Sequence, residues 1–253
     1  MKRMKAISIV AVIAMASPAW AVSIGLNFVG GRSGGGGNGS GGTNGNLVTG
    51  VAGVVPQGNW NNGLGSNNAG PVALVDDSGA ATGATASWSG VANSWTVSGA
   101  AAADGDAQLM NGYLDTSTSS TTPVSITGVP YATYDVILYF DGDGTGRSGN
   151  YTVNGSPALA GNPLADNANW PVGGPAPTAG AYNDATLDGI GNYAIFSGQV
   201  SPVLTVTASA SNFRGPLNGI QIINTTTIPE PTLAALGLMS LGALAIRRRR
   251  RAA

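Results

Sequence analysis

Because the sequence contains no histidine and no cysteine, the side chains left for chemistry in this 253-residue chain are those of Asp, Arg, Tyr, Ser, Thr and Asn. A Ser-His-Asp triad, a Cys-His nucleophile, a zinc site of His or Cys ligands and a disulfide framework are therefore excluded. Two acidic pairs, Asp76-Asp77 and Asp104-x-Asp106, could supply the facing carboxylates that a glycoside hydrolase needs. Exposed turns explain these pairs equally well, and 22–224 contains no glutamate. We expect no catalytic residues and a protein that is not an enzyme.

A third acidic group follows the apolar run 134–140. Asp141 and Asp143 are separated by one glycine and could offer two carboxylates to Ca²⁺, which takes about six to eight oxygen ligands. An EF-hand is excluded, because its twelfth position would be Thr152 instead of glutamate. A looser calcium site and a plain Asp/Gly turn both remain open, and no other cofactor is expected.

Flat aromatic rings in asparagine-rich surroundings are candidates for sugar binding. Trp60 and Trp170 lie in segments expected to be loops, where neighbouring asparagines could form hydrogen bonds with sugar hydroxyls. Trp88 and Trp95 lie in strand-like runs, so a place in the core explains them at least as well. Trp60 and Trp170 are therefore the candidate sugar-binding residues.

The formal net charge of −1 hides an uneven distribution of charge along the chain. Eight of the eleven basic residues lie at the two ends, and 22–224 holds three arginines against eleven aspartates, a formal charge of −8. Because nucleic-acid binding needs basic patches, no nucleic-acid partner is expected for this central segment.

Residues 1–21 have the parts of a secretory signal peptide. A basic start is followed by the apolar run 6–16, and Ala19 and Ala21 form the small-residue pattern that signal peptidase recognises. The apolar run of 11 residues is shorter than the roughly 20 that span a bilayer, which argues against the alternative of an uncleaved anchor. Cleavage after Ala21 would export the body of the protein.

The C-terminal end combines a proline-flanked motif, an apolar segment and a basic cluster. The linker 225–231 ends in Pro229-Glu230-Pro231, where two prolines favour extended and accessible backbone. The uncharged segment 232–246 would form a transmembrane helix of about 23 Å, with snorkelling arginines extending its reach. The tail 247–253 is predicted to be cytoplasmic by the positive-inside rule. Its basic residues are Arg247, Arg248, Arg249, Arg250 and Arg251.

This order of parts resembles the PEP-CTERM sorting signal of Gram-negative bacteria, which is also named after ice-binding proteins that carry it. The resemblance covers about the last 26 residues. It implies that exosortase, a membrane transpeptidase, recognises Pro229, Glu230 and Pro231, with the arginines as a retention signal. The precursor would be anchored transiently in the inner membrane, and its body would then reach the cell envelope or the extracellular space. A plain tail anchor is the alternative.

Residues 22–224 are predicted to form one all-β domain. Short β-prone runs are separated by Gly, Pro, Asn and Asp clusters, and no stretch keeps a helical apolar period over 11 residues. We expect a single antiparallel β-sandwich or jelly roll, flanked by the N-terminal signal helix and the C-terminal transmembrane helix. The run 134–140 is predicted to be a central core strand, Leu204 and Val206 to share one face of a strand, and the glycine-rich stretch 30–46 to be a solvated loop. A β-solenoid would need a fixed repeat, which is missing.

The last predicted strand, 217–223, is similar to the ending of galactose-binding-like jelly rolls, a group that includes carbohydrate-binding modules. This resemblance implies sugar binding without assigning residues. The leading interpretation is an exported, non-catalytic protein of the cell envelope or extracellular matrix. The alternative is a module that binds extracellular polysaccharide at the cell surface, and a carboxylate-only glycoside hydrolase ranks third.

Overall fold

The computed structural model describes residues 22–30, 47–89, 93–96, 104–142, 147–157, 164–165 and 182–226. Several predicted features lie outside these ranges. They are the signal peptide with Ala19 and Ala21, the glycine-rich stretch from 31 to 46, Asp143, Trp170, the motif Pro229-Glu230-Pro231, the segment 232–246 and the arginines 247–251.

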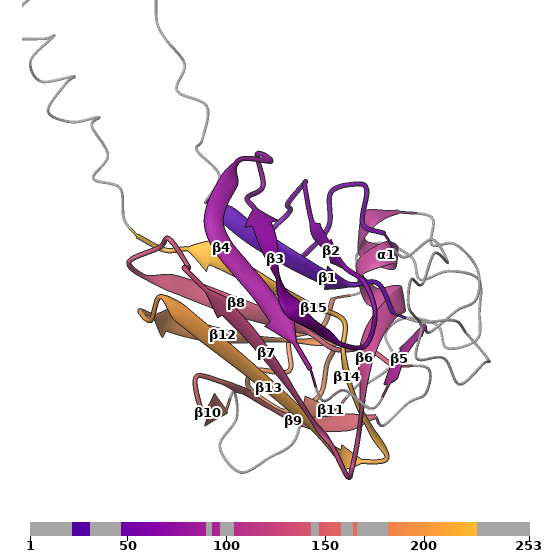
Figure 1. The fold of residues 1–253 in the computed structure, drawn as a ribbon. Coiled ribbons are helices and arrows are strands. Elements are labelled where there is room, and N and C mark those ends of the chain that lie inside the picture. Colours follow the sequence, from indigo (N-terminus) through magenta and orange to yellow (C-terminus); the bar gives the residue numbers. More distant parts are fainter. Residues whose placement is uncertain are drawn as a thin grey trace, which may run out of the picture.

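Two large sheets lie face to face and form the body of the molecule (Figure 1). The first has the order β12-β8-β15-β1-β2, and these strands span Tyr193–Gln199, Tyr134–Tyr139, Gly219–Asn224, Ser23–Phe28 and Asn61–Gly63. The second has the order β10-β9-β13-β7-β4-β3, spanning Ser156–Pro157, Ser148–Val153, Val203–Asn212, Thr121–Thr127, Ala81–Trp88 and Asn68–Val75, and β11 (Leu164–Ala165) also pairs with β9. The prediction of an all-β fold is confirmed.

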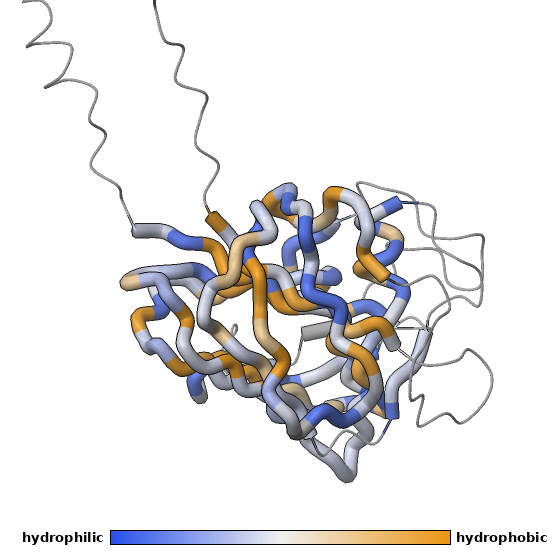
Figure 2. The backbone as a smooth tube through the Cα atoms, turned by 45° about the horizontal axis from the view of Figure 1, so that its top comes forward, coloured by the Kyte–Doolittle hydropathy of each residue, from blue (hydrophilic) through white to orange (hydrophobic). Residues whose placement is uncertain are grey.

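Alternate residues of the two sheets meet in the main hydrophobic core. The first sheet contributes Val136 of β8, and the second contributes Leu204 and Val206 of β13, all fully buried. Across the sheets, the indole of Trp88 meets the ring of Phe28 edge-on, with 5.3 Å between ring centroids. Figure 2 shows apolar and polar residues interspersed along these strands. Because side chains alternate between the two faces of a strand, every second residue of these strands points into the core.

One edge departs from the predicted antiparallel pattern, because β2 pairs with β1 in parallel. The Asn61 side chain in β2 explains this pairing. Its amide nitrogen donates to the carbonyl oxygens of Gly25 at 2.8 Å and Val75 at 2.9 Å, and its Oδ1 accepts from the Val75 N–H. The expectation of an antiparallel sandwich is wrong at this edge. The side-chain hydrogen bonds of Asn61 hold β2 between β1 and β3, and a hairpin turn does not.

The outer face of the first sheet is covered by the helix α1 (Gly105–Asn111) and by the segment 47–60. Asp104 caps this helix, since its carboxylate accepts a hydrogen bond from the N–H of Ala107 at 2.8 Å. Strand β8 is therefore buried on both faces, which confirms the prediction of a central core strand. The residues that pack together on this outer face include Ile137, Tyr139, Leu109 and Met110.

A third sheet of three strands lies at one end of the sandwich, in the order β14-β6-β5. Its strands span Arg214–Leu217, Gly112–Ser117 and Asn93–Thr96. The sheet touches the end of β1, because a Cβ atom at Gly112 would collide with the carbonyl group of Val29. Position 112 therefore requires glycine for close approach of the two backbones.

Within the described ranges, no helix is long and apolar enough to cross a membrane.

Replacing Tyr139 by phenylalanine is expected to lower the free energy of unfolding by about 1–3 kcal/mol, because it leaves buried polar groups unsatisfied. The fully buried hydroxyl donates to Oε1 of Gln221 at 2.7 Å and accepts from the N–H of Val54 at 2.9 Å. Burial also raises the pKa of Tyr139, which keeps this donor protonated. Urea denaturation measures the loss, and Tyr193→Phe, at a partly exposed position, serves as the control and should cost less than about 1 kcal/mol. Equal losses in the two variants would contradict the prediction.

Candidate functional site

A cavity of about 200 Å³ lies against the three-stranded sheet. Strand β5 lines it with Asn93 and Trp95, and β6 lines it with Tyr113 and Asp115. The register explains this grouping, because Asn93 pairs with Asp115 and Trp95 pairs with Tyr113. Residues two apart on a strand share a face, so these four side chains form one wall of the cavity.

The residues between them face away from the cavity. Leu114 is part of the main hydrophobic core, and Ser94 is also fully buried. Tyr113 and Asp115 are themselves only 2% and 4% exposed, whereas Trp95 is half-buried. The core therefore anchors β6 from behind, and Tyr113 and Asp115 form the buried part of the cavity wall.

Phe213 lines the cavity from an unusual backbone conformation. It is the single residue between β13 and β14, and its φ angle of 51° lies in the left-handed region. That region costs a non-glycine residue about 1–2 kcal/mol. The side chain is also 64% exposed. A large exposed ring in a costly conformation points to a role in function, because packing does not require it there.

Two arginines lie against the Phe213 ring. The guanidinium carbon of Arg147 is 4.8 Å from the ring centroid, and that of Arg214 is 5.4 Å from it. Each cation–π contact contributes roughly 0.5–1 kcal/mol. Arg147 is kept near the ring by β9, because Ser148 pairs with Asn212, the residue before Phe213. The ring therefore fixes both cations at the edge of the cavity.

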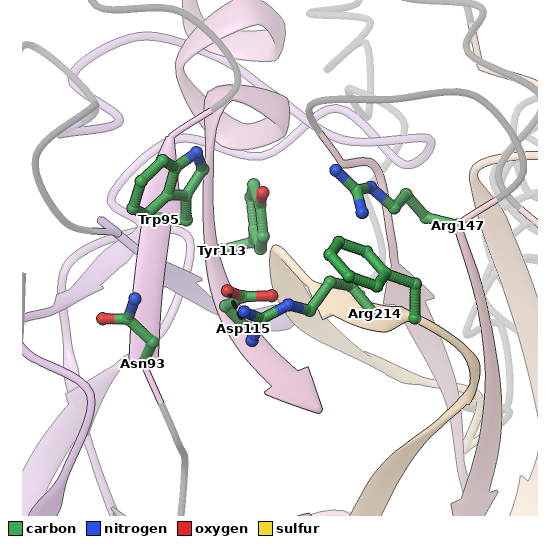
Figure 3. Close-up of a pocket in the computed structure, with 7 residues that line it drawn as sticks. Asn93, Trp95, Tyr113, Asp115, Arg147 and Arg214 are labelled. Carbon is green, nitrogen blue, oxygen red and sulfur yellow. Dashed lines mark ion pairs between the residues drawn. The ribbon is translucent and has the colours of Figure 1, made fainter. Parts of the chain in front are cut away.

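Arg214 also forms an ion pair inside the cavity. Its Nη1 lies 3.1 Å from Oδ2 of Asp115, and the two side chains are 31% and 6% exposed. Figure 3 shows Asn93 and Trp95 on one side of the cavity and Arg147 on the other, with Tyr113 between them. Aromatic and cationic groups therefore face each other across the space.

These two arginines are the only cationic side chains in the ranges that the structure describes, which contain no lysine. All of the acidic residues in the same ranges are aspartates. Both arginines nevertheless line one cavity. Positive potential in the described body is thus concentrated at this site.

Trp60 does not present a flat ring to solvent, and the prediction of an exposed loop tryptophan is wrong for this residue. It is 5% exposed, and its indole N–H donates to the carbonyl oxygens of Gln57 at 3.1 Å and Ala52 at 3.3 Å. Its ring packs edge-on against Tyr139, at 6.1 Å between centroids. Two backbone carbonyls thus satisfy the buried indole, and the ring packs inside the protein. Trp170 lies outside the described residues.

The candidate calcium ligands are only partly described. Asp141 is fully buried after β8, and its backbone N–H donates to Oδ1 of Asn218 at 2.6 Å. Asp143 lies outside the described residues. Among the residues that are described, no three His, Cys, Asp or Glu side chains converge as a metal site would require. The calcium site stays a prediction.

Three carboxylates of the other acidic pairs accept hydrogen bonds that stabilise the fold. Oδ1 of Asp76 accepts hydrogen bonds from Ser78 and from the Ala80 N–H in an exposed turn, and the Ser78 hydroxyl lowers the pKa of Asp76. Asp104 caps α1, and Asp106 accepts a hydrogen bond from the Tyr182 hydroxyl at 2.7 Å. None of these carboxylates lines the cavity, whose lining includes Asp115 instead.

Sequence reasoning did not single out Asp115, Arg147, Phe213 or Arg214. One signal was available, because a segment with three arginines in about 200 residues is unusually poor in cations. Two of the three line this cavity. These two arginines come close together only through strand pairings, which the local sequence pattern does not predict.

No protein-family model matches this chain, and no curated protein matches it either. Among solved structures, it is similar to β-glucuronidase 2 of Bacteroides uniformis, with 15% identity and a TM-score of 0.34 over 55% of this chain and 14% of that one. A family GH115 4-O-methyl-α-glucuronidase with specificity for decorated arabinogalactans aligns at 10% identity and a TM-score of 0.26, over 45% of this chain and 14% of that one. The catalytic unit of a GH87 α-1,3-glucanase from Streptomyces thermodiastaticus aligns at 13% identity and a TM-score of 0.28, over 48% and 22%.

These comparisons correct one expectation. All three similar chains are glycoside hydrolases, which contradicts the expectation that the protein is not an enzyme, and we withdraw it. This chain spans 14% to 22% of their length. With TM-scores of 0.26 to 0.34, the similarity assigns neither a ligand nor a catalytic residue to it.

Replacing Phe213 by asparagine is expected to leave the free energy of unfolding unchanged within about 0.5 kcal/mol. Asparagine adopts the left-handed region more readily, which offsets the loss of two cation–π contacts of roughly 0.5–1 kcal/mol each. Phe213→Ala loses the contacts without the backbone gain, so it should be less stable than Phe213→Asn by about 1 kcal/mol. Thermal and urea denaturation measure both variants. An alanine variant as stable as the asparagine variant would show that the backbone at Phe213 is unstrained.

Proposed function

We propose that this chain is an exported surface protein whose β body binds a polysaccharide in the cavity beside the three-stranded sheet. The observation that carries the proposal is a cavity in which the half-buried ring of Trp95 shares the lining with Asn93 and with the exposed ring of Phe213, held in a left-handed conformation. The Trp95 ring provides a flat apolar surface for the C–H face of a sugar, and Asn93 offers hydrogen-bonding groups for its hydroxyls.

The size of the cavity agrees with this ligand. About 200 Å³ is below the range of roughly 300–1,000 Å³ typical of pockets for drug-sized molecules. A site of this size suits one sugar residue of a longer chain. The two facing sheets support a sandwich of the jelly-roll class, an architecture that occurs in lectin domains.

The position of the cavity suits display at a surface. Ser23 pairs with Ile223 in the register of β1 and β15, so both ends of the body leave from the same end of the first sheet. The other end of β1 touches the three-stranded sheet, through Val29 and Gly112. Six residues of β-strand separate these ends by roughly 20 Å. A tether at either terminus therefore leaves the cavity on the distal side.

Delivery would use the two targeting signals of the sequence. Signal peptidase would cleave after Ala21, and the inner membrane would hold the precursor transiently through 232–246. An exosortase-type transpeptidase would then recognise Pro229-Glu230-Pro231 and pass the body to the cell envelope or the extracellular matrix. The order of motif, apolar segment and arginine cluster supports this route.

Removing the Trp95 ring tests the binding function. Trp95→Ala is expected to weaken polysaccharide binding at least about 10-fold, because the wall formed by β5 loses its stacking surface. Affinity electrophoresis and calorimetry against a panel of neutral and acidic polysaccharides measure the change, with folding verified by thermal denaturation. Leu187→Ala is the control, because Leu187 is 88% exposed and does not line the cavity. The proposal fails if the wild-type protein binds no polysaccharide of the panel, or if Trp95→Ala and Phe213→Asn both bind as the wild type does.

Substituting Pro229-Glu230-Pro231 by three alanines tests the sorting route. In a host that contains exosortase, the variant is expected to accumulate in the inner-membrane fraction, while the wild-type body is released. Cell fractionation and immunoblotting measure the distribution, and an exosortase-deficient host provides the matched control. Identical processing of variant and wild type in the exosortase-containing host would rule the route out.

A further inference from the structure

We infer that the outer face of the second sheet is a contact surface for a second copy of this chain. This hydroxyl face consists of the outward-facing residues of β4, β7, β9 and β13, which include Thr85, Ser125, Thr127, Thr152, Thr205 and Thr207. None of these residues lines the cavity beside the three-stranded sheet. The inference therefore goes beyond polysaccharide binding and does not depend on it.

The pairing of the strands arranges the hydroxyl face in ranks across the sheet. Thr85 pairs with Thr127, and Thr127 pairs with Val203. One rank further along the strands, Ser125 pairs with Thr205. Neighbouring strands lie about 4.8 Å apart, and outward side chains repeat about every 6.7 Å along each strand. Thr127 and Thr205 are exposed, so the face is a regular surface open to solvent.

The distribution of charge favours contact between two such faces. None of the six strands of the second sheet contains a charged residue. Residues 22–224 nevertheless carry a formal charge of −8, so the aspartates lie on other parts of the body. Because two copies of an acidic body repel each other, the contact of lowest electrostatic cost joins their uncharged faces. A basic partner would be attracted to the aspartates instead.

The side chains of the face suit another protein surface better than a sugar. The aromatic residues of these strands, Trp88 and Tyr151, are buried in the core, so these strands present no ring on which a sugar could stack. The Oγ1 atoms of Thr85 and Thr127 lie 3.0 Å apart and form a hydrogen bond within one copy, which lowers the cost of covering them. Their methyl groups and the side chain of Val203, 44% exposed, would then pack against the second copy.

Other surfaces of the sandwich are less suited to pairing. Helix α1 and the segment 47–60 cover the outer face of the first sheet. The edge strand β12 is capped, because the N–H of Ile195 donates to Oγ1 of Thr186 at 2.9 Å. In the second sheet, the edge strand β3 contains Pro71 and two register shifts. These features hinder edge-to-edge pairing and leave the hydroxyl face as the broad open surface.

The size of the face predicts a weak dimer. Five strands, β3, β4, β7, β13 and β9, at about 4.8 Å each and about seven residues long, cover roughly 550 Å² per copy. Two copies would bury roughly 1,100 Å² in total, just below the range of about 1,200–2,000 Å² for stable interfaces. A two-fold contact of sheets packed about 10 Å apart would close after two copies. The dimer should therefore form mainly at high local concentration, as on a crowded surface.

Sedimentation velocity of the purified protein tests the inference. The sedimentation coefficient is expected to rise from that of a monomer towards that of a dimer between micromolar and near-millimolar concentration. Added salt should tighten the association, because it screens the repulsion between two acidic bodies. An interface held by ion pairs would instead weaken in salt, and this result would contradict the uncharged contact.

Thr205→Asp is the informative variant. It places a charge within each face and is expected to weaken association at least about 10-fold, because a two-fold contact would bury both unpaired carboxylates. Leu187→Asp is the matched control, since it adds the same charge at a residue that is 88% exposed and lies outside the second sheet. It should associate as the wild type does. Thr205→Val keeps the shape of the side chain and should associate at least as tightly as the wild type. Thermal denaturation verifies that the variants are folded.

The outcomes either support the inference or overturn it. A protein that stays monomeric at every concentration and salt overturns it. Association that Thr205→Asp leaves unchanged also overturns it, because another part of the chain, such as 232–246, then forms the contact. Equal weakening by Leu187→Asp would show that net charge, and not the hydroxyl face, governs association. If the wild type is monomeric and Thr205→Asp weakens polysaccharide binding, the face binds that polymer and the proposed second copy is wrong.

Discussion

The buried amide of Asn218 is the contact that joins the first sheet, helix α1 and the end of the three-stranded sheet. This residue stands between β14 and β15 and is fully buried. Its Nδ2 donates to the carbonyl of Met110 at 2.9 Å, and its Oδ1 accepts from the N–H of Asp141 at 2.6 Å. Its backbone N–H donates to the carbonyl of Tyr139 at 2.8 Å, and its carbonyl accepts from the N–H of Phe28 at 2.8 Å. The ends of α1, β8 and β1 therefore meet at one residue. The side-chain amide and the backbone of Asn218 form hydrogen bonds with residues that lie far away in the sequence.

The cavity beside the three-stranded sheet depends on the same stretch of chain. Strands β13, β14 and β15 are consecutive, yet each belongs to a different sheet. The chain passes from β13 to β14 within one residue, Phe213, and the left-handed backbone there makes the change of direction. The turn exposes the ring beside Arg214 at the start of β14, while the pairing of β13 with β9 brings Arg147 to the same ring. The fold thus adds Arg147, which is far away in the sequence, to the adjacent residues Phe213 and Arg214.

Local patterns predicted the core better than the site, and the difference has a physical cause. The alternation in β13 correctly placed Leu204 and Val206 on one face, which is the buried one, because a strand with one buried face repeats every two residues. Trp60 was assigned to the wrong environment, and Trp95 was left open between the core and a sugar site, because this rule uses only neighbouring residues. The burial of Trp60 depends on Tyr139, and the position of Trp95 depends on its pairing with Tyr113. Neither tyrosine lies within a short window around its tryptophan, and Arg147 is likewise far in the sequence from Phe213.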